Sequence, residues 1–76
     1  MWILTQGREE LLKVERFRFL ALVNGDVRIL AKLSKGTVTL GEYGESQADD
    51  ILGELFHYLS LTDVDNYEMP ARLEEF

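Results

Sequence analysis

The chain has 76 residues, a formal net charge of −6 at pH 7, an apolar fraction of 46% and no cysteine. This length allows one domain, and the apolar content exceeds that of a disordered chain and predicts a packed core. The absence of cysteine excludes disulfides and thiolate metal sites, and the net negative charge argues against general nucleic-acid binding.

The N-terminal residues and the hydropathy pattern bear on location. Met1–Thr5 lacks the basic start and the long apolar stretch of a secretory signal. No segment approaches the run of about 18 apolar residues that a membrane-spanning helix needs. Together with the missing cysteines, these features predict a cytoplasmic protein that has no membrane partner.

Two short strands are expected first. Trp2–Thr5 is apolar and rich in β-favouring residues, and Leu11–Val14 follows a polar segment with one glycine, so the two runs predict a hairpin. Trp2 is expected to pack in the core against a helix, although a tryptophan near a terminus also suits a binding hot spot.

A second hairpin is centred on Asn24-Gly25, the strongest short-range turn signal in the chain, and joins Phe17–Val23 to Val27–Leu33. A two-residue loop would put arginines on the same face as the apolar side chains. A three-residue loop with Gly25 in the left-handed conformation makes one face wholly apolar and is therefore preferred. That face consists of Phe17, Phe19, Ala21, Val27, Ile29 and Ala31.

The next turn is expected around Gly36, through a connection of two or four residues that brings Val38 and Leu40 to the apolar face. Gly41 lies inside the strand-like run that follows, where a glycine often marks a bulge or a close approach by another backbone. Tyr43, at the end of this run, either packs against the helix or stays at the surface. The strands up to this point predict an antiparallel meander.

The apolar period then changes from two residues to three or four, which predicts one helix over residues 46–60. Ser46 is expected to cap its N-terminus, with Asp49 completing a capping box. The opposite, polar face of this helix includes Gly53 and His57. The predicted buried stripe consists of Ala48, Ile51, Leu52, Leu55, Phe56 and Leu59.

The periodicity is lost in residues 62–76, an acidic C-terminal segment in which Thr62–Asn66 is expected to be a loop. The sequence thus predicts an α+β fold, with one domain over residues 1–61. The domain is expected to be an antiparallel β-meander of four to five strands with the helix packed on one face. Charge follows a similar division, because residues 1–44 hold seven basic and five acidic side chains, whereas residues 45–76 hold one basic and nine acidic ones.

No residue pattern predicts catalysis, a cofactor or a metal site. His57 is the only histidine and is expected at the surface, and carboxylates that are neighbours in sequence point apart on a strand or helix. Asp63, Asp65 and Asn66 resemble the start of a calcium-binding loop, but Glu68 stands where that loop requires glycine. We therefore expect a protein that is not an enzyme and holds no cofactor and no metal.

One surface remains as a candidate site. In the preferred register the outer face of the main hairpin combines three leucines with four cations, and a monomer seldom leaves such an apolar patch uncovered. Either the C-terminal segment folds back over it, or a second copy or another protein binds there. The candidate interaction surface consists of Arg16, Arg18, Leu20, Leu22, Arg28, Leu30 and Lys32.

This surface favours a protein-interaction module, with a homodimer through the outer sheet face as one form of it. A regulatory, nucleic-acid-binding role is the alternative, in which the four cations Arg16, Arg18, Arg28 and Lys32 would contact phosphates. That alternative is the weaker one, because four cations on a chain of net charge −6 produce a small field.

Three short segments also indicate a family resemblance. They are Met1–Gln6 at the start, Leu40–Tyr43 at a strand end, and, in the helix, Ala48, Ile51, Leu52 and Leu55. These segments resemble a family of small uncharacterised proteins of Gram-positive bacteria and their phages, which begin with a Met-Trp-Ile strand and reach a Leu-Gly-x-Tyr strand end before one helix. The resemblance covers residues 1–60 and implies the same order of elements. It implies no activity and no site residue.

Overall fold

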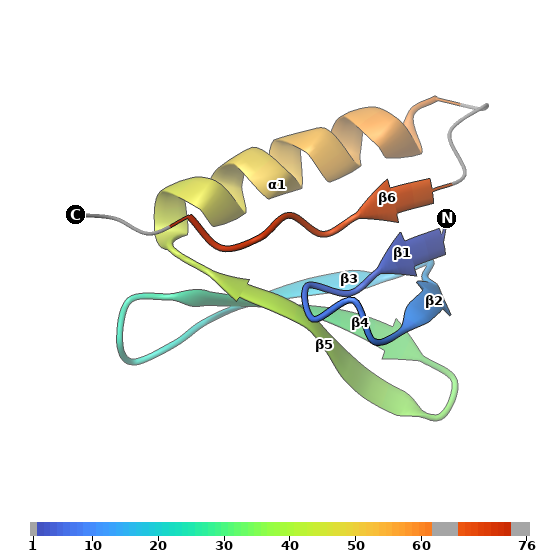
Figure 1. Ribbon diagram of the computed structural model, residues 1–76, viewed down its shortest axis with the longest axis horizontal. Helices are drawn as coiled ribbons and strands as arrows, with labels where there is room; N and C mark the ends of the chain where they lie inside the picture. Colours follow the sequence, from blue (N-terminus) through green and yellow to red (C-terminus); the bar gives the residue numbers. More distant parts are fainter. Residues whose placement is uncertain (1, 62–65, 74–76) are drawn as a thin grey trace.

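The computed structural model describes residues 2–61 and 66–73, which form an α+β fold (Figure 1). The elements are β1 (Trp2–Leu4), β2 (Leu11–Lys13), β3 (Phe17–Ala21), β4 (Val27–Leu33), β5 (Gly36–Tyr43), α1 (Glu45–Leu59) and β6 (Asn66–Glu68). In this described part the strands form two sheets: sheet A with the order β2-β1-β6 and sheet B with the order β3-β4-β5. Sheet B is an antiparallel meander, so the predicted fold class is confirmed.

The main hairpin of sheet B has the register that the sequence favoured. Phe19 lies opposite Ile29, so both side chains are on the same, inner face of the sheet. The Leu22 amide donates to the Asp26 carbonyl at 2.8 Å and closes a three-residue loop. Gly25 has a φ of +90°, the left-handed conformation that this loop needs. The predicted loop length and orientation of this hairpin are therefore confirmed.

β4 and β5 are joined by a two-residue loop, and β5 then bends at a bulge. Leu30 pairs with Thr39 and Ile29 pairs with Gly41, which leaves Leu40 as the extra residue of β5. A bulge bends its strand and increases the local twist. It occurs where the glycine inside the strand predicted it, and it directs the last residues of β5 toward the start of α1.

Sheet A contains two features that the sequence did not predict. β1 and β2 pair with each other and not with the meander, so they belong to a separate sheet. β6 follows a segment expected to be a loop, and it adds to β1 in parallel, with Ile3 beside Tyr67. Figure 1 shows β6 and β1 between α1 and the meander. The core therefore forms between sheet B on one side and α1 with sheet A on the other.

The core combines side chains from both sheets, the helix and the C-terminal segment. Tyr43 is fully buried, and its hydroxyl donates to the Pro70 carbonyl at 2.7 Å. Trp2 is exposed, so the expectation that it packs in the core is wrong: neighbours in a strand face opposite sides, and Ile3 takes the inner one. The buried apolar side chains are Ile3, Val14, Ile29, Ala31, Leu40, Tyr43, Ala48, Ile51, Leu55, Tyr67 and Met69.

Residues 66–73 dock along β1 and α1. The Met69 amide donates to the Leu4 carbonyl at 3.0 Å and continues the contact begun by β6. Arg72 donates two hydrogen bonds of 2.6 and 2.9 Å to Asp26, which lower the pKa of that carboxyl below its ordinary value. For the described residues, the idea that this segment covers the outer face of the meander is therefore wrong. They lie on the helix side instead, because β1 offers an unpaired edge there.

α1 begins one residue earlier than predicted and without the predicted cap. Its N-cap is Gly44, which makes no side-chain capping hydrogen bond. Ser46 lies inside the first turn, so the expected capping box of Ser46 and Asp49 does not form. The Ala48 amide donates to the Gly44 carbonyl at 2.9 Å, because the end of β5 leads almost directly into the helix.

The buried stripe of α1 is narrower than predicted and displaced to one flank. Its fully buried positions are Ala48, Ile51 and Leu55. Leu52 and Phe56, by contrast, are 49% and 77% exposed, while the side chain of Leu59 lies outside the described part. Tyr67 of β6 packs against Tyr58, with ring centroids 5.5 Å apart. Tyr58 thus lies on the flank of the helix that contacts β6, whereas Leu52 and Phe56 lie on a flank that stays exposed.

Gly53→Ala is expected to raise the free energy of unfolding by about 1 kcal/mol, because glycine loses more backbone entropy in a helix than alanine does. Gly53 lies at an exposed position inside α1, and an added Cβ would meet no heavy atom within 4 Å. Thermal unfolding followed by circular dichroism should show a Tm higher by about 4 to 8 °C. An unchanged or lower Tm would contradict this expectation.

The protein is expected to lose stability between pH 10 and pH 12 through two buried tyrosines. Burial raises the pKa of Tyr43 from 10.0 to about 12, and burial with a hydrogen bond to Glu54 raises the pKa of Tyr67. The folded state holds protons that the unfolded chain releases, so this contribution is complete below pH 10 and declines as the pH rises through the folded pKa. Urea unfolding across this range should show the decline, and Tyr43→Phe should make it shallower. A flat profile would count against it.

Candidate interaction surface

Six of the seven predicted surface residues lie together on one side of sheet B. Arg18 lies opposite Leu30, and Leu20 lies opposite Arg28, and alternation along the strands directs these side chains away from the core. Leu20 is 40% exposed and Leu30 is half-buried. We call this surface the outer face; it consists of Arg16, Arg18, Leu20, Arg28, Leu30 and Lys32. In Figure 1 it is the side of the meander turned away from α1.

The cations of the outer face differ in their partners. Arg28 pairs with Glu42 on the neighbouring strand, with 3.1 Å between Nε and Oε2. A surface pair of this kind contributes less than about 1 kcal/mol. Arg16, Arg18 and Lys32 are exposed and have no ion-pair partner among the described residues. The outer face therefore keeps a basic character around its leucines.

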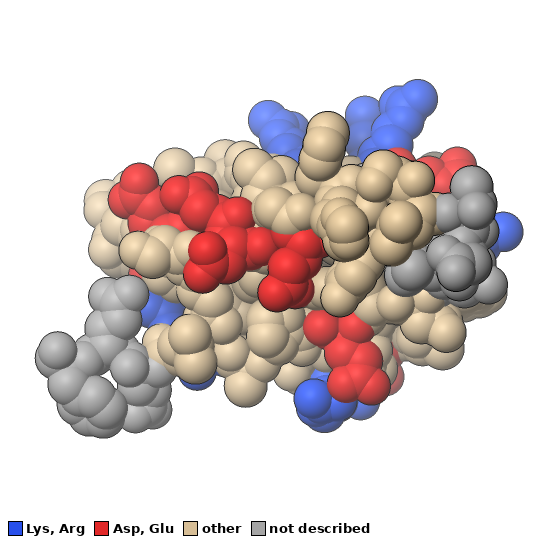
Figure 2. Space-filling view, turned by 90° about the horizontal axis from the view of Figure 1, so that it is seen from above, with Lys and Arg blue, Asp and Glu red and all other residues tan. Residues whose placement is uncertain are grey.

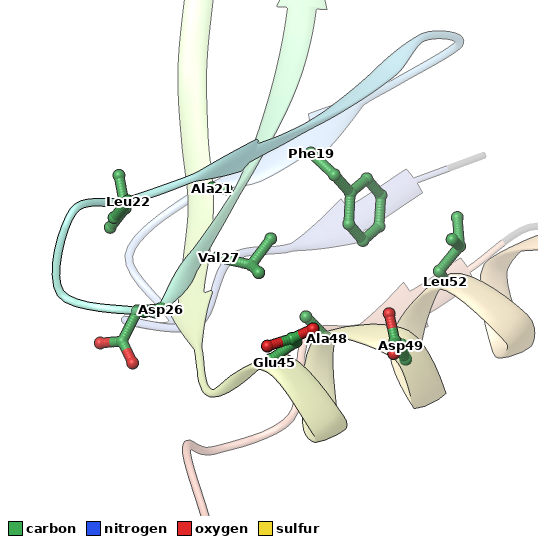
Figure 3. A pocket seen from close by; sticks show the side chains of 10 residues that line it. Phe19, Ala21, Leu22, Asp26, Val27, Glu45, Ala48, Asp49 and Leu52 are labelled. Atoms are coloured by element: carbon green, nitrogen blue, oxygen red, sulfur yellow. The ribbon is translucent and has the colours of Figure 1, made fainter.

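Leu22, the seventh predicted residue, follows the end of β3 and lines a groove that the sequence did not predict. This α1–β3 groove runs between β3 with its loop and the uncovered flank of α1, and encloses about 370 Å³. Figure 3 shows the side chains of Phe19 and Leu52 pointing into it from strand and helix. Its lining residues are Phe19, Ala21, Leu22, Gly25, Asp26, Val27, Glu45, Ala48, Asp49 and Leu52. The sequence holds one signal for this groove: the predicted apolar stripe of the helix has more positions than a narrow sheet can cover, so some of them have to stay exposed.

The helix side of the protein is acidic. α1 exposes Glu45, Asp49, Asp50 and Glu54. Figure 2, which looks on to this side, shows a band of acidic side chains across it and Lys and Arg side chains at its margin. The charge division along the sequence thus becomes a division between two sides of the molecule, with the basic outer face opposite the acidic helix.

In the described part of the chain, the side chains that could support catalysis or metal binding are not grouped into a site. His57 is exposed, as predicted, and its ring lies 5.9 Å from that of Tyr58. Within residues 2–61 and 66–73, no three His, Cys, Asp or Glu side chains are grouped to hold a metal ion. Of the calcium-loop pattern, Asp63 and Asp65 lie outside the described residues, and Asn66 is exposed at the start of β6. No helix in the described part is both long and apolar enough to cross a membrane.

No known protein family, curated protein or solved structure matches the chain. The resemblance of residues 1–60 to small proteins of Gram-positive bacteria and their phages therefore stays a prediction. The outer face and the α1–β3 groove are the surfaces of the described residues that combine exposed apolar side chains with charged ones.

Proposed function

We propose that this chain is a non-enzymatic protein-interaction module of the cytoplasm that binds its partner through the outer face. The observation that supports the proposal is that Leu20 and Leu30 lie on a sheet face that no described segment covers. Hiding one leucine from water contributes about 1.5 to 3 kcal/mol, so covering this face is favourable. Because the leucines lie among cations, the surface of the partner that fits the outer face is apolar with an acidic rim. The partner is either another protein or a second copy of this chain.

A pair of matched variants tests the proposal. Leu20 and Leu61 are 40% and 39% exposed, but only Leu20 lies on the outer face. Tagged wild-type protein, Leu20→Asp and Leu61→Asp are used to capture partners from the source cells, and captured proteins are quantified by mass spectrometry. We expect a partner that is retained by wild type and by Leu61→Asp and is reduced at least about tenfold with Leu20→Asp. Equal capture by the two variants would contradict a role of the outer face.

The same variants address the homodimer through the outer face. Light scattering coupled to size-exclusion chromatography measures the mass of each variant, and circular dichroism checks that it is folded. A dimer held face to face should become monomeric with Leu20→Asp and stay dimeric with Leu61→Asp. A folded Leu20→Asp monomer also distinguishes a lost contact from a lost fold.

Nucleic-acid binding is the second candidate, favoured by the three cations of the outer face that have no ion-pair partner in the described part. A strip of Arg16, Arg18, Arg28 and Lys32 would contact phosphates, with a strong dependence on salt. A gel-shift assay at low ionic strength tests it with single- and double-stranded DNA and RNA. Binding that is lost with Arg16→Glu/Arg18→Glu would support this function, and no shift at low salt would remove it.

A further inference from the structure

β3 is an edge strand whose free side presents regularly spaced backbone groups. The Lys32 amide donates to the Arg16 carbonyl, and the Leu22 amide donates to the Asp26 carbonyl. In an antiparallel pair, every second residue directs its N–H and C=O to the same neighbour, so Arg18 and Leu20 also point theirs toward β4. The residues between them, Phe17, Phe19 and Ala21, therefore point their N–H and C=O groups to the free side. In the described part of the chain, these groups have no backbone partner.

The other sheet edges are shorter or partly closed. β2 and β6 have three residues each, whereas β3 has five. The end of β5 is covered by Gln6, whose amide donates to the Leu40 carbonyl and whose side chain both accepts from the Glu42 amide and donates to the Glu42 carbonyl. Proteins generally protect exposed edges, because an open edge pairs with another strand. Among residues 2–61 and 66–73, no segment covers the free edge of β3 in this way.

We propose that β3 pairs antiparallel with β3 of a second copy of this chain, with Phe19 of each copy at the two-fold axis. The two meanders then become one continuous sheet. This inference goes beyond the proposed function, because it uses the free edge of β3 and not the outer face. Edge pairing would also join the outer faces of the two copies into one larger surface for a further partner.

Charge and strand length together select this register among those centred on the middle of β3. Centring on Arg18 would place the two Arg18 side chains opposite each other, which is unfavourable for like charges. Centring on Leu20 would pair Phe17 with Val23, which lies outside the strand. With Phe19 at the centre, Phe17 lies opposite Ala21, and Arg18 lies opposite Leu20. All five residues of β3 are then paired, and each arginine faces a leucine.

The α1–β3 groove supplies a second argument for a second copy. Phe19 is half-buried in the groove, and Leu52 lines it from α1. Phe56 lies one helical turn after Leu52, and both side chains are exposed. Figure 3 shows that the groove lies between β3 with its loop and α1. The two-fold axis would bring the groove residues of both copies together above the joined strands. The same dimer would thus pair the free N–H and C=O groups of β3 and bury exposed apolar side chains of both helices.

The first test measures dimerisation by sedimentation equilibrium on charge variants at position 20. Leu20→Arg places an arginine opposite Arg18 of the second copy twice per dimer, so the dissociation constant should rise about tenfold or more. Arg18→Glu/Leu20→Arg replaces each like pair by an opposite pair and should return the constant to within about threefold of wild type. Leu20→Asp should keep or tighten the edge dimer, whereas it would dissociate a dimer formed face to face. Circular dichroism confirms that each variant is folded.

A second test depends on the absence of cysteine from the chain. In the proposed dimer, Arg18 and Leu20 of the second copy form a non-hydrogen-bonded pair with Cα atoms about 4.5 Å apart, within the disulfide range of about 4.4 to 6.8 Å. Arg18→Cys and Leu20→Cys proteins are mixed and oxidised. We expect the mixed disulfide to form at least about tenfold faster than either symmetric one. Equal rates for all three products would overturn the register.

The dependence of the dimer dissociation constant on salt is a further test. Each copy carries a net charge of −6, so screening of the repulsion between copies should strengthen the dimer as salt is added. A monomer at concentrations up to about 1 mM would overturn the inference. So would a dimer that Leu20→Arg leaves intact. If the protein is a monomer, the edge dimer is overturned, but loss of partner capture with Leu20→Asp would still support binding through the outer face. The two proposals can therefore fail separately.

Discussion

Met69→Ala should lower the free energy of unfolding by about 2 to 5 kcal/mol, although the sequence places Met69 in an acidic C-terminal segment with no periodicity. The side chain of Met69 is 1% exposed and belongs to the core. Its backbone amide extends the pairing of β6 with β1 through the Leu4 carbonyl. Truncation at a buried site of this kind removes apolar contacts and leaves a cavity between the sheets and the helix.

Urea unfolding followed by circular dichroism measures this effect. A domain of this size is expected to have a total stability of about 4 to 11 kcal/mol, so the variant should be partly unfolded before urea is added or unfold at low urea. Leu73→Ala is the matched control, because Leu73 is exposed and lies in the same docked segment. It should change the stability by less than about 0.5 kcal/mol. Equal effects of the two substitutions would show that the segment is not part of the core.

Gly41→Ala should destabilise the protein by about 1 to 3 kcal/mol, because the new methyl group would overlap the ring of Tyr43. A Cβ at this position would lie 2.7 Å from Cε2 and 2.8 Å from the hydroxyl oxygen of Tyr43, and 3.0 Å from Cβ of Gln6. The ring cannot easily move aside, since it is fully buried and its hydroxyl is bound to the Pro70 carbonyl. Gly41 is thus required by a close side-chain approach and not by a turn.

Two comparisons make the Gly41 prediction specific. Gly7→Ala should be close to neutral, because the nearest atom to a Cβ there is 3.9 Å away, in the exposed side chain of Glu9. In a Tyr43→Ala background, the cost of Gly41→Ala should fall by at least half, since the clash is removed. Stabilities come from urea unfolding of the four proteins of this cycle. An undiminished cost in that background would place the strain elsewhere.

The sequence predicted the meander well because its signals are local. Asn24-Gly25 and the alternation of apolar residues on either side determine one register, since a shift by one residue would bury arginines. Gly41 likewise indicated the bulge from its position inside a strand. Each of these features depends on residues within a few positions of each other, and the outer face follows directly from the same register.

The parts that the sequence did not predict depend on contacts between distant segments. β6 has only three residues, and it forms a strand because β1 offers an edge. Tyr67 of β6 contacts Tyr58 on one flank of α1, while Leu52 and Phe56 stay exposed and Leu52 lines the α1–β3 groove. Neither the groove nor the free edge of β3 could be identified before the positions of β6 and the helix were known.

The parallel pairing of β1 with β6 joins the two segments that are farthest apart in the described chain. Trp2 lies beside Asn66, so this contact closes a loop that contains every other element. Contacts of such long sequence separation are entropically costly to form and slow the folding of small domains. During synthesis, β1 can pair with β6 only after every element between them has been made. Until then, the free edge of β1 is open to mispairing.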